Sequence, residues 1–122
     1  MKELTKAEER IMQILWTLEK GFTRDVLDQF EKNKPGYTTV ATVLNVLEQK
    51  GFVAHKVLGN SKQFYPLISK SKYSEFAMGN VMSKYFEGSL SQLVSFFTDR
   101  KKLDINELDE IIRIIESKKE EE

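Results

Sequence analysis

The stretch from Tyr37 to Gly51, YTTVATVLNVLEQKG, decides the fold that the sequence predicts. At the roughly 100° per residue of an α-helix, its apolar and its uncharged polar residues gather on opposite sides. The apolar side consists of Val40, Val43, Leu44 and Leu47. The opposite side, called the polar face below, consists of Thr38, Thr42, Asn45 and Gln49. This division predicts an amphipathic helix with a core-facing stripe.

The composition of the polar face is unusual for an exposed helix surface. Such surfaces are commonly rich in Lys and Glu, which favour the helix and form ion pairs. Here every side chain can donate and accept hydrogen bonds, and none is charged. Because threonine and asparagine lower helix propensity, the composition favours contact with a partner, such as base edges in a DNA major groove. A solvated face without a partner is the alternative.

Two helices are predicted before this one, of which the second is short. The first begins after Thr5, which forms a capping-box pattern with Glu8, and runs to about residue 20, where Gly21 ends it. Trp16 lies beside its apolar stripe and is expected to be a core anchor. Thr23 is the expected cap of a second helix, from about residue 24 to residue 32.

The connection and the third helix complete a helix-turn-helix pattern. Residues 33–36, Asn-Lys-Pro-Gly, have the composition of a turn. Thr38 or Thr39 is the expected cap of the third helix, and Gly51 its end. Two helices, a short connection and a helix with a polar outer face fit this motif, although other small helical domains match it too.

A β-hairpin is predicted directly after the third helix. Residues 52–58 are rich in apolar and β-branched residues, residues 59–61 are Gly-Asn-Ser, and residues 63–67 form a returning strand. A hairpin at this place is the wing of a winged helix-turn-helix. Pro66 requires that the returning strand lie at an edge or end there. Lys56 and Lys62 flank the tip and are expected to contact DNA phosphates, or alternatively only to keep the hairpin soluble.

Residues 71–122 predict three helices with apolar stripes. The last has a strong start, because Asp104 can cap it and Glu107 can close the capping box. A large exposed apolar surface would be a liability, so these helices predict a dimer interface, with packing inside one chain as the competing interpretation. The predicted dimerisation residues are Tyr73, Phe76, Tyr85, Phe86, Leu90, Leu93, Leu108, Ile111, Ile112 and Ile115.

Size and composition limit the classes of protein that remain. A chain of 122 residues with 40% hydrophobic residues suits a small domain with an appended helical module. The absence of cysteine excludes disulfides and thiolate metal sites. No apolar run approaches the roughly 18–20 residues of a membrane span, and the N-terminus lacks the apolar segment of a signal peptide, so a soluble, cytoplasmic protein without membrane insertion is expected.

The sequence shows no pattern typical of an enzyme. It contains no Ser/His/Asp arrangement, no glycine-rich phosphate loop and no metal-ligand spacing, so no catalytic residue, metal or cofactor is expected. The single histidine, His55, lies in the first wing strand, where a structural hydrogen bond or a phosphate contact suits it better than catalysis. We therefore expect a non-enzymatic protein.

The charge is distributed unevenly although its sum is zero. Residues 1–70 contain eleven Lys and Arg against eight Asp and Glu, whereas residues 71–122 contain eight against eleven. Between Gln49 and Ser74 there is no acidic residue. A polyanion is thus expected to bind the N-terminal half.

With these elements in order, the chain resembles the penicillinase and methicillin-resistance repressors, the BlaI/MecI/CopY family. The resemblance extends from Leu4 to about Ile115, over LTKAEERIMQILW, YTTVATVLNVLEQKGFVAHK, Phe64-Tyr65-Pro66-Leu67, LSQLVSFF and LDINELDEIIRII. It implies a homodimeric repressor that binds an inverted repeat of TACA/TGTA type in double-stranded operator DNA.

The resemblance also assigns residues and shows departures. Thr38, Thr39 and Thr42 match the DNA-facing positions of the family, but Asn45 and Val46 stand where relatives carry Arg or Lys, which changes the expected operator. In β-lactam-responsive relatives, a membrane metallopeptidase signals and the repressor is cut before a Phe. Phe96-Phe97 occupies that place, but Phe96 replaces the Asn of those relatives, so cleavage is left open. Without cysteine, the copper-responsive mechanism of the family is excluded.

The resulting prediction is mainly α with a small β-hairpin wing, in two parts. Residues 1–70 are the winged helix-turn-helix domain and residues 71–122 the dimerisation module. The predicted base contacts are Thr38, Thr39, Thr42, Asn45 and Gln49, and the predicted backbone contacts are Lys34, Tyr37, Lys50, Lys56 and Lys62. A winged-helix protein-interaction module is the alternative function.

Overall fold

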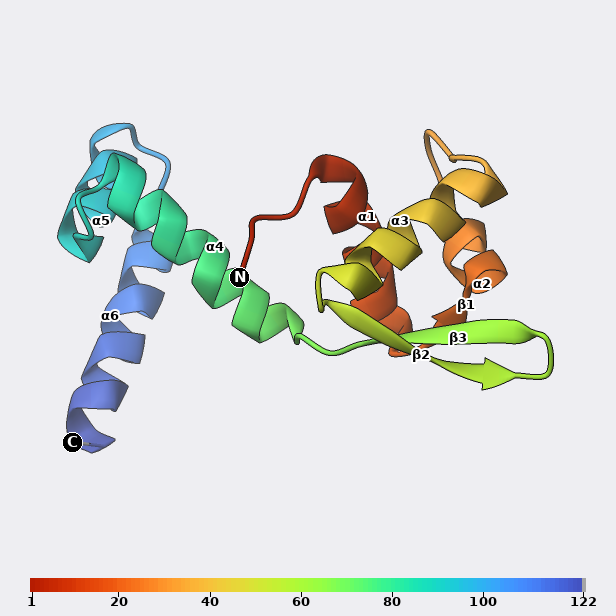
Figure 1. The fold of residues 1–122 in the computed structure, drawn as a ribbon. Helices are drawn as coiled ribbons and strands as arrows, with labels where there is room; N and C mark the ends of the chain where they lie inside the picture. Colours follow the sequence, from red (N-terminus) through yellow and green to blue (C-terminus); the bar gives the residue numbers. More distant parts are fainter. Residues whose placement is uncertain (122) are drawn as a thin grey trace. The chain divides into compact units, whose positions relative to one another are not determined.

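The computed structural model describes residues 1–121 and divides them into two compact units. The first unit runs from Met1 to Ala77, and the second begins at Met78, within one helix. The elements are α1 (Lys6–Leu18), β1 (Gly21–Phe22), α2 (Thr23–Asp28), α3 (Tyr37–Gln49), β2 (Val53–Leu58), β3 (Ser61–Pro66), α4 (Lys70–Tyr85), α5 (Leu90–Asp99) and α6 (Ile105–Glu121). Figure 1 shows α1, α2 and α3 packed together, with β2 and β3 projecting as a hairpin. The predicted fold, mainly α with a hairpin wing, is confirmed.

Helix α1 begins as predicted and ends earlier. Thr5 Oγ1 accepts the Glu8 N–H at 3.2 Å, and Glu8 Oε1 accepts the Thr5 N–H at 2.9 Å, so the capping box is present. The helix ends at Leu18 because Glu19 has left the helical conformation, with φ of 71°. Gly21 was predicted to end the helix, but it is the first residue of β1.

Strand β1 is too short to be predicted from the sequence, and it shifts the start of the next helix. It pairs antiparallel with β3, which makes β3 the central strand of a three-stranded sheet. Asp25 Oδ2 accepts the Phe22 N–H at 2.8 Å, so Phe22 takes the cap position. The predicted cap, Thr23, is instead the buried first residue of α2, and the helix ends at Asp28, before the predicted residue 32.

Helix α3 has the predicted core face and a different start. Val40, Leu44 and Leu47 are fully buried, and Val43 is partly buried. Gly36 is the N-cap, so neither Thr38 nor Thr39 caps the helix. Gly51 ends it as predicted, with φ of 83°, a conformation that glycine adopts without steric cost.

The hairpin is confirmed and its turn is tighter than the predicted one. Leu58 pairs with Ser61, so Gly59 and Asn60 alone form the loop. Gly59 has a positive φ of 64° and Asn60 does not, which is the pattern of a type II′ turn. Pro66 is the last residue of β3, where a missing N–H is tolerated.

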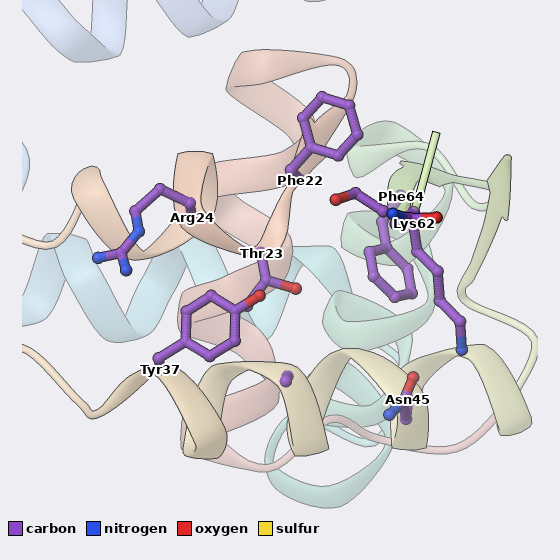
Figure 2. Close-up of a pocket in the computed structure, with 10 residues that line it drawn as sticks. Phe22, Thr23, Arg24, Tyr37, Asn45, Lys62 and Phe64 are labelled. Carbon is purple, nitrogen blue, oxygen red and sulfur yellow. The ribbon is translucent and has the colours of Figure 1, made fainter. Parts of the chain in front are cut away.

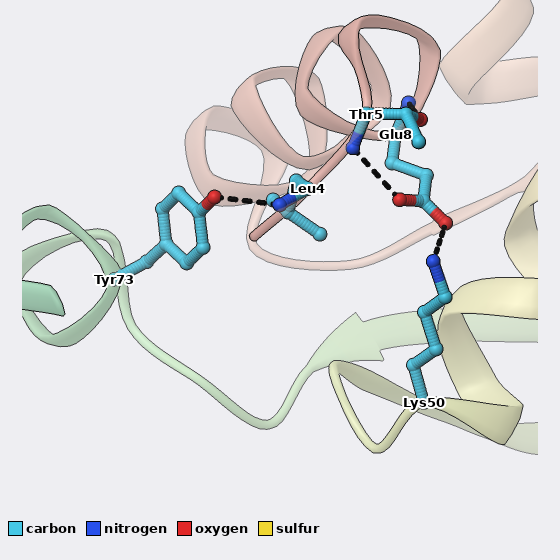
Figure 3. A network of polar contacts seen from close by, with 5 residues as sticks. All are labelled: Leu4, Thr5, Glu8, Lys50 and Tyr73. Carbon is cyan, nitrogen blue, oxygen red and sulfur yellow. Dashed lines mark hydrogen bonds and ion pairs between the residues drawn. The ribbon is translucent and has the colours of Figure 1, made fainter. Parts of the chain in front are cut away.

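The first half of α4 belongs to the core of the first unit. Tyr73 is 6% exposed, and its Oη accepts the Leu4 N–H at 2.7 Å (Figure 3). Its ring packs against Phe52 and Trp16, with centroid separations of 5.9 and 6.1 Å. Trp16 is a core anchor as expected, and its Nε1 donates to the Ile68 carbonyl at 2.8 Å. Tyr73 is therefore an intrachain core residue rather than a dimer contact, and Phe76 is partly buried against the same core.

The second unit lacks a buried core of its own. Asp104 Oδ1 accepts the Glu107 N–H at 2.8 Å, which confirms the predicted cap of α6. Between residues 78 and 121 no side chain is fully buried. Among the predicted dimerisation residues, the exposed ones are Tyr85, Leu90, Ile112 and Ile115, and the half-buried ones are Phe86, Leu93, Leu108 and Ile111. Over the described residues, every helix is too short or too polar to cross a lipid bilayer.

Candidate nucleic-acid interface

The polar face of α3 is exposed along its whole length. Thr38, Thr42, Asn45 and Gln49 all lie at the surface, opposite the buried stripe. Thr39, also exposed, lies about 100° round the helix from Thr38 and so borders the polar face rather than belonging to it. None of these five side chains hydrogen-bonds to another group within residues 1–121, so their donors and acceptors are available to a partner.

A second stripe of α3 faces the wing. Tyr37, Ala41 and Asn45 follow one another at intervals of four residues, and Asn45 therefore belongs to both surfaces. At the end of this stripe Glu48 Oε2 lies 2.5 Å from His55 Nδ1 of β2. This contact connects the wing to α3. Of the two roles predicted for His55, a structural hydrogen bond and a phosphate contact, the structure shows the first.

A cavity of about 320 Å³, called the α3–wing cavity below, lies between these elements. Its walls are residues 22–24 at the start of α2, the stripe Tyr37, Ala41 and Asn45, and residues 60–62 with Phe64 of the wing. Figure 2 shows Arg24 beside Tyr37 at one side and Lys62 extending from β3 toward the helix that carries Asn45. Two cations and no carboxylate line this cavity, which makes it suited to an anion.

The two wing lysines lie on opposite faces of the hairpin. Paired residues of neighbouring strands share a face, and the pairs are Lys56 with Gln63 and Val57 with Lys62. Lys62 shares its face with Phe64 and lines the α3–wing cavity. Lys56 instead lines a cavity on the other face, together with Glu19 and Lys20. Only Lys62 of this pair therefore lies beside the polar face of α3.

Lys50 is engaged within the chain (Figure 3). Its Nζ lies 2.6 Å from Glu8 Oε2, and the Glu8 side chain is only 6% exposed. Burial by itself raises the pKa of Glu8, but the hydrogen bonds from Lys50 and Thr5 and the charge of Lys50 together outweigh it, so the pKa lies below its usual value. The phosphate contact predicted for Lys50 remains a prediction. In this structure the Lys50 ammonium is paired with Glu8.

Two further cations lie near the helix-turn-helix: Lys34, which was predicted as a DNA contact, and Arg24, which was not. Lys34 is exposed, with its Nζ 3.9 Å from Asp28 Oδ1. Arg24 has its guanidinium 5.4 Å from the centre of the Tyr37 ring. The sequence placed Arg24 only at the start of the second predicted helix and gave it no role. The sequence signal that could have indicated Arg24 was the excess of basic residues in residues 1–70. That excess does not distinguish one basic residue from another.

No metal site accompanies this surface. Across the described residues, His, Asp and Glu side chains nowhere form a group of three that could hold a metal ion.

Comparison with known proteins gives consistent matches over most of the chain. Residues 4–117 match the model of the penicillinase repressor family. The methicillin resistance regulatory protein MecI of Staphylococcus aureus (strain N315) is 25% identical over 117 residues, which cover 95% of each chain. The penicillinase repressor of Bacillus licheniformis is 25% identical over 118 residues, covering 96% of this chain and 92% of that one.

A solved structure matches part of the chain. The solution structure of the DNA-binding domain of the repressor BlaI superimposes with a TM-score of 0.51 and 27% identity. The match covers 60% of this chain and 94% of that domain.

Proposed function

The chain belongs to the penicillinase repressor family, whose members are transcriptional repressors and not enzymes, and from that premise we propose that it binds an inverted-repeat operator as a homodimer. The observation that carries the proposal is the polar face of α3. Its side chains are exposed and uncharged, and they make no side-chain hydrogen bond within residues 1–121. When such a helix enters a major groove, its polar side chains lose water but gain hydrogen-bond partners on the base edges.

Base contacts are assigned to the polar face and its border. Thr38, Thr42, Asn45 and Gln49 project from the side of α3 opposite the core, and Thr39 adds a hydroxyl at its first turn. Threonine can donate or accept a hydrogen bond and can place its methyl group against a thymine methyl, while asparagine and glutamine can pair with adenine. These five residues are proposed to determine the preferred operator.

Backbone contacts are assigned to the flanks of α3. Lys62 and Tyr37 lie on its wing side, and Lys34 precedes its start. Lys56 reaches the DNA only if the hairpin tip meets the backbone edge-on, because it projects from the other face. Each neutralised phosphate contributes to affinity and to its salt dependence irrespective of base sequence.

The dimer is assigned to the second unit. Between residues 78 and 121 no side chain is fully buried, yet Leu90, Ile112 and Ile115 are each about half exposed or more. A unit that leaves so much apolar surface in water gains free energy when a second copy covers it. Two copies would then place two α3 helices on half-sites one or two helical turns apart.

Induction by cleavage between Phe96 and Phe97 is left open by the family resemblance. Both residues lie inside α5 and are 39% exposed. A protease binds its substrate in an extended conformation, so α5 must open locally before a membrane metallopeptidase could cut it. The absence of buried side chains in α5 makes such opening inexpensive.

The test is binding of the full chain to the DNA upstream of its own gene, measured by gel shift between about 50 and 200 mM salt. With six or more phosphate contacts for the dimer, affinity is expected to fall about 10³-fold or more over this range. A scrambled duplex of equal length is the control for specificity. No retardation even at the lowest salt would instead support the protein-interaction module.

A further inference from the structure

The α3–wing cavity differs in its charge from three other surface cavities. It is lined by Arg24 and Lys62 and by no carboxylate. Each of these three cavities includes a glutamate beside its cations, namely Glu31, Glu110 and Glu19. An anion in the α3–wing cavity therefore meets attraction without opposing repulsion.

Three polar side chains of this cavity have no hydrogen-bonding or ionic partner within residues 1–121. Arg24, Asn45 and Lys62 take part in no ion pair and no side-chain hydrogen bond over residues 1–121. The Arg24 guanidinium lies 5.4 Å from the Tyr37 ring centre, a cation–π distance. Its planar group of donors is thus partly preorganised, and guanidinium groups suit phosphate oxygens particularly well.

The position of the cavity selects the source of the anion. Asn45 belongs both to the cavity and to the polar face, so the cavity opens on the wing-side flank of α3. When a helix lies in a major groove, the sugar-phosphate backbones pass along its flanks. A DNA backbone would therefore pass over this opening.

Resting on the proposed function, we propose that the α3–wing cavity holds a short stretch of one strand's sugar-phosphate backbone. Arg24 and Lys62 contact phosphates from its two sides, and Tyr37 positions the Arg24 guanidinium. Arg24 thereby becomes a DNA-contacting residue contributed by α2, outside the polar face and the wing. The contact contributes affinity and register but no base preference.

The first test measures the salt dependence of operator binding for Arg24→Gln, Lys62→Gln and the double variant. Each lost phosphate contact lowers the slope of log K against log salt by about 0.9 per bound subunit. For a single subunit this corresponds to about 5-fold weaker binding at 0.15 M salt and about 15-fold at 0.05 M; a dimer loses two contacts, so its affinity falls about 30-fold and about 200-fold. Base preference stays unchanged. Lys84→Gln, an exposed lysine of α4, is the matched control and leaves the slope unaltered.

The second test isolates the positioning role of Tyr37. Tyr37→Leu removes the ring and keeps the cation, so affinity falls about two- to five-fold while the salt slope is retained. In the Arg24→Gln background the same change has a smaller effect, because only the backbone contact of Tyr37 itself is then lost. A loss that is equally large in both backgrounds would show that Tyr37 does not act through Arg24.

Two outcomes overturn the proposal and remain distinct from failure of the proposed function. If the wild-type chain binds its operator specifically and Arg24→Gln keeps both affinity and slope, the cavity does not hold backbone, whereas the repressor assignment stands. If Arg24→Gln keeps the salt slope of operator binding, while inorganic phosphate protects the wild type but not this variant against thermal unfolding, the cavity is a site for free anions and not for DNA backbone. Absence of specific binding by the wild type itself refutes the proposed function. Circular dichroism melting of each variant verifies that the fold is retained.

Discussion

The ion pair between Glu8 and Lys50 connects the start of α1 to the end of α3, and its removal has a predictable asymmetry. Glu8→Gln deletes the anion but keeps an oxygen that can accept the Thr5 N–H, because glutamine also serves in a capping box. Lys50→Met deletes the cation and keeps most of the stem. The two variants break the same 2.6 Å contact and leave different charges behind.

The magnitudes follow from the exposure of the two side chains. In Glu8→Gln the remaining ammonium of Lys50, whose side chain is 33% exposed, can turn to water. The loss is then that of one charge-assisted hydrogen bond, about 1–2 kcal/mol in the free energy of unfolding. In Lys50→Met the carboxylate left behind is 6% exposed and cannot be hydrated, so we expect about 2–3 kcal/mol, below the range for a fully buried pair.

The acid dependence separates the two variants further. The folded-state pKa of Glu8 is depressed, so the stability that its ionisation contributes is present above the unfolded pKa, about 4.3, and is lost as the pH falls through the folded value. Without Lys50, the hydrogen bond and the charge of its ammonium no longer lower that pKa, so it lies higher than in the wild type. Protonation then relieves the buried charge, so the deficit of Lys50→Met is expected to shrink as the pH falls from 7 to 4.

The measurement is urea unfolding followed by circular dichroism, at one protein concentration because the chain is proposed to dimerise. Glu9→Gln, an exposed carboxylate of the same helical turn, is the control and is expected to stay within about 0.5 kcal/mol of the wild type. The reasoning is refuted if Glu8→Gln costs more than Lys50→Met at pH 7, or if the deficit of Lys50→Met does not change with pH.

Three further predictions concern the polar face, the dimer and the core. Thr42→Ala is expected to change the preference among single-base operator variants by about 1–3 kcal/mol at one position, measured by competition binding; unchanged preference and affinity would reject the polar face as the base-contacting surface. Ile112→Asp, at a position that is 51% exposed, is expected to leave secondary structure intact and to produce monomers in analytical ultracentrifugation, whereas a persistent dimer would move the interface elsewhere. Trp16→Phe removes the hydrogen bond to the Ile68 carbonyl and is expected to destabilise the first unit by about 1–2 kcal/mol in urea unfolding; a neutral result would show that water replaces the indole.

The sequence predicts the helices of this fold better than their ends. The spacing of Val40, Leu44 and Leu47 is a property of many residues together, and all three are buried. The start of α2 depends instead on one hydrogen bond, from the Phe22 N–H to Asp25, and on the pairing of β1 with a strand some forty residues later. Thr23 has good cap propensity, but that tertiary pairing overrides it.

The function of single cations was harder to predict, because charge alone does not show which partner a side chain has. Lys50 ends the helix that carries the polar face, which made it a natural phosphate contact. The structure places it against Glu8, a residue that the sequence already assigned to a capping box. Tyr73 was assigned to the dimer by its apolar stripe, and only the fold shows that the beginning of α4 packs on the first unit.

The wing shows how one residue of loop length decides which lysine accompanies α3. A three-residue turn, Gly59 to Ser61, would pair Leu58 with Lys62 and Lys56 with Phe64, and both lysines would share one face. The observed two-residue loop pairs Leu58 with Ser61, which moves Lys56 to the opposite face.

Inserting one glycine between Asn60 and Ser61 offers the strands this alternative pairing. The Phe64 side chain, which is 2% exposed, opposes the change because it anchors β3 in the core. The insertion is thus expected to enlarge the loop while Lys62 keeps its face. Lys56→Gln should then alter the salt slope of operator binding less than Lys62→Gln, in the wild type and in the insertion variant alike; equal effects would show that the wing meets the DNA edge-on.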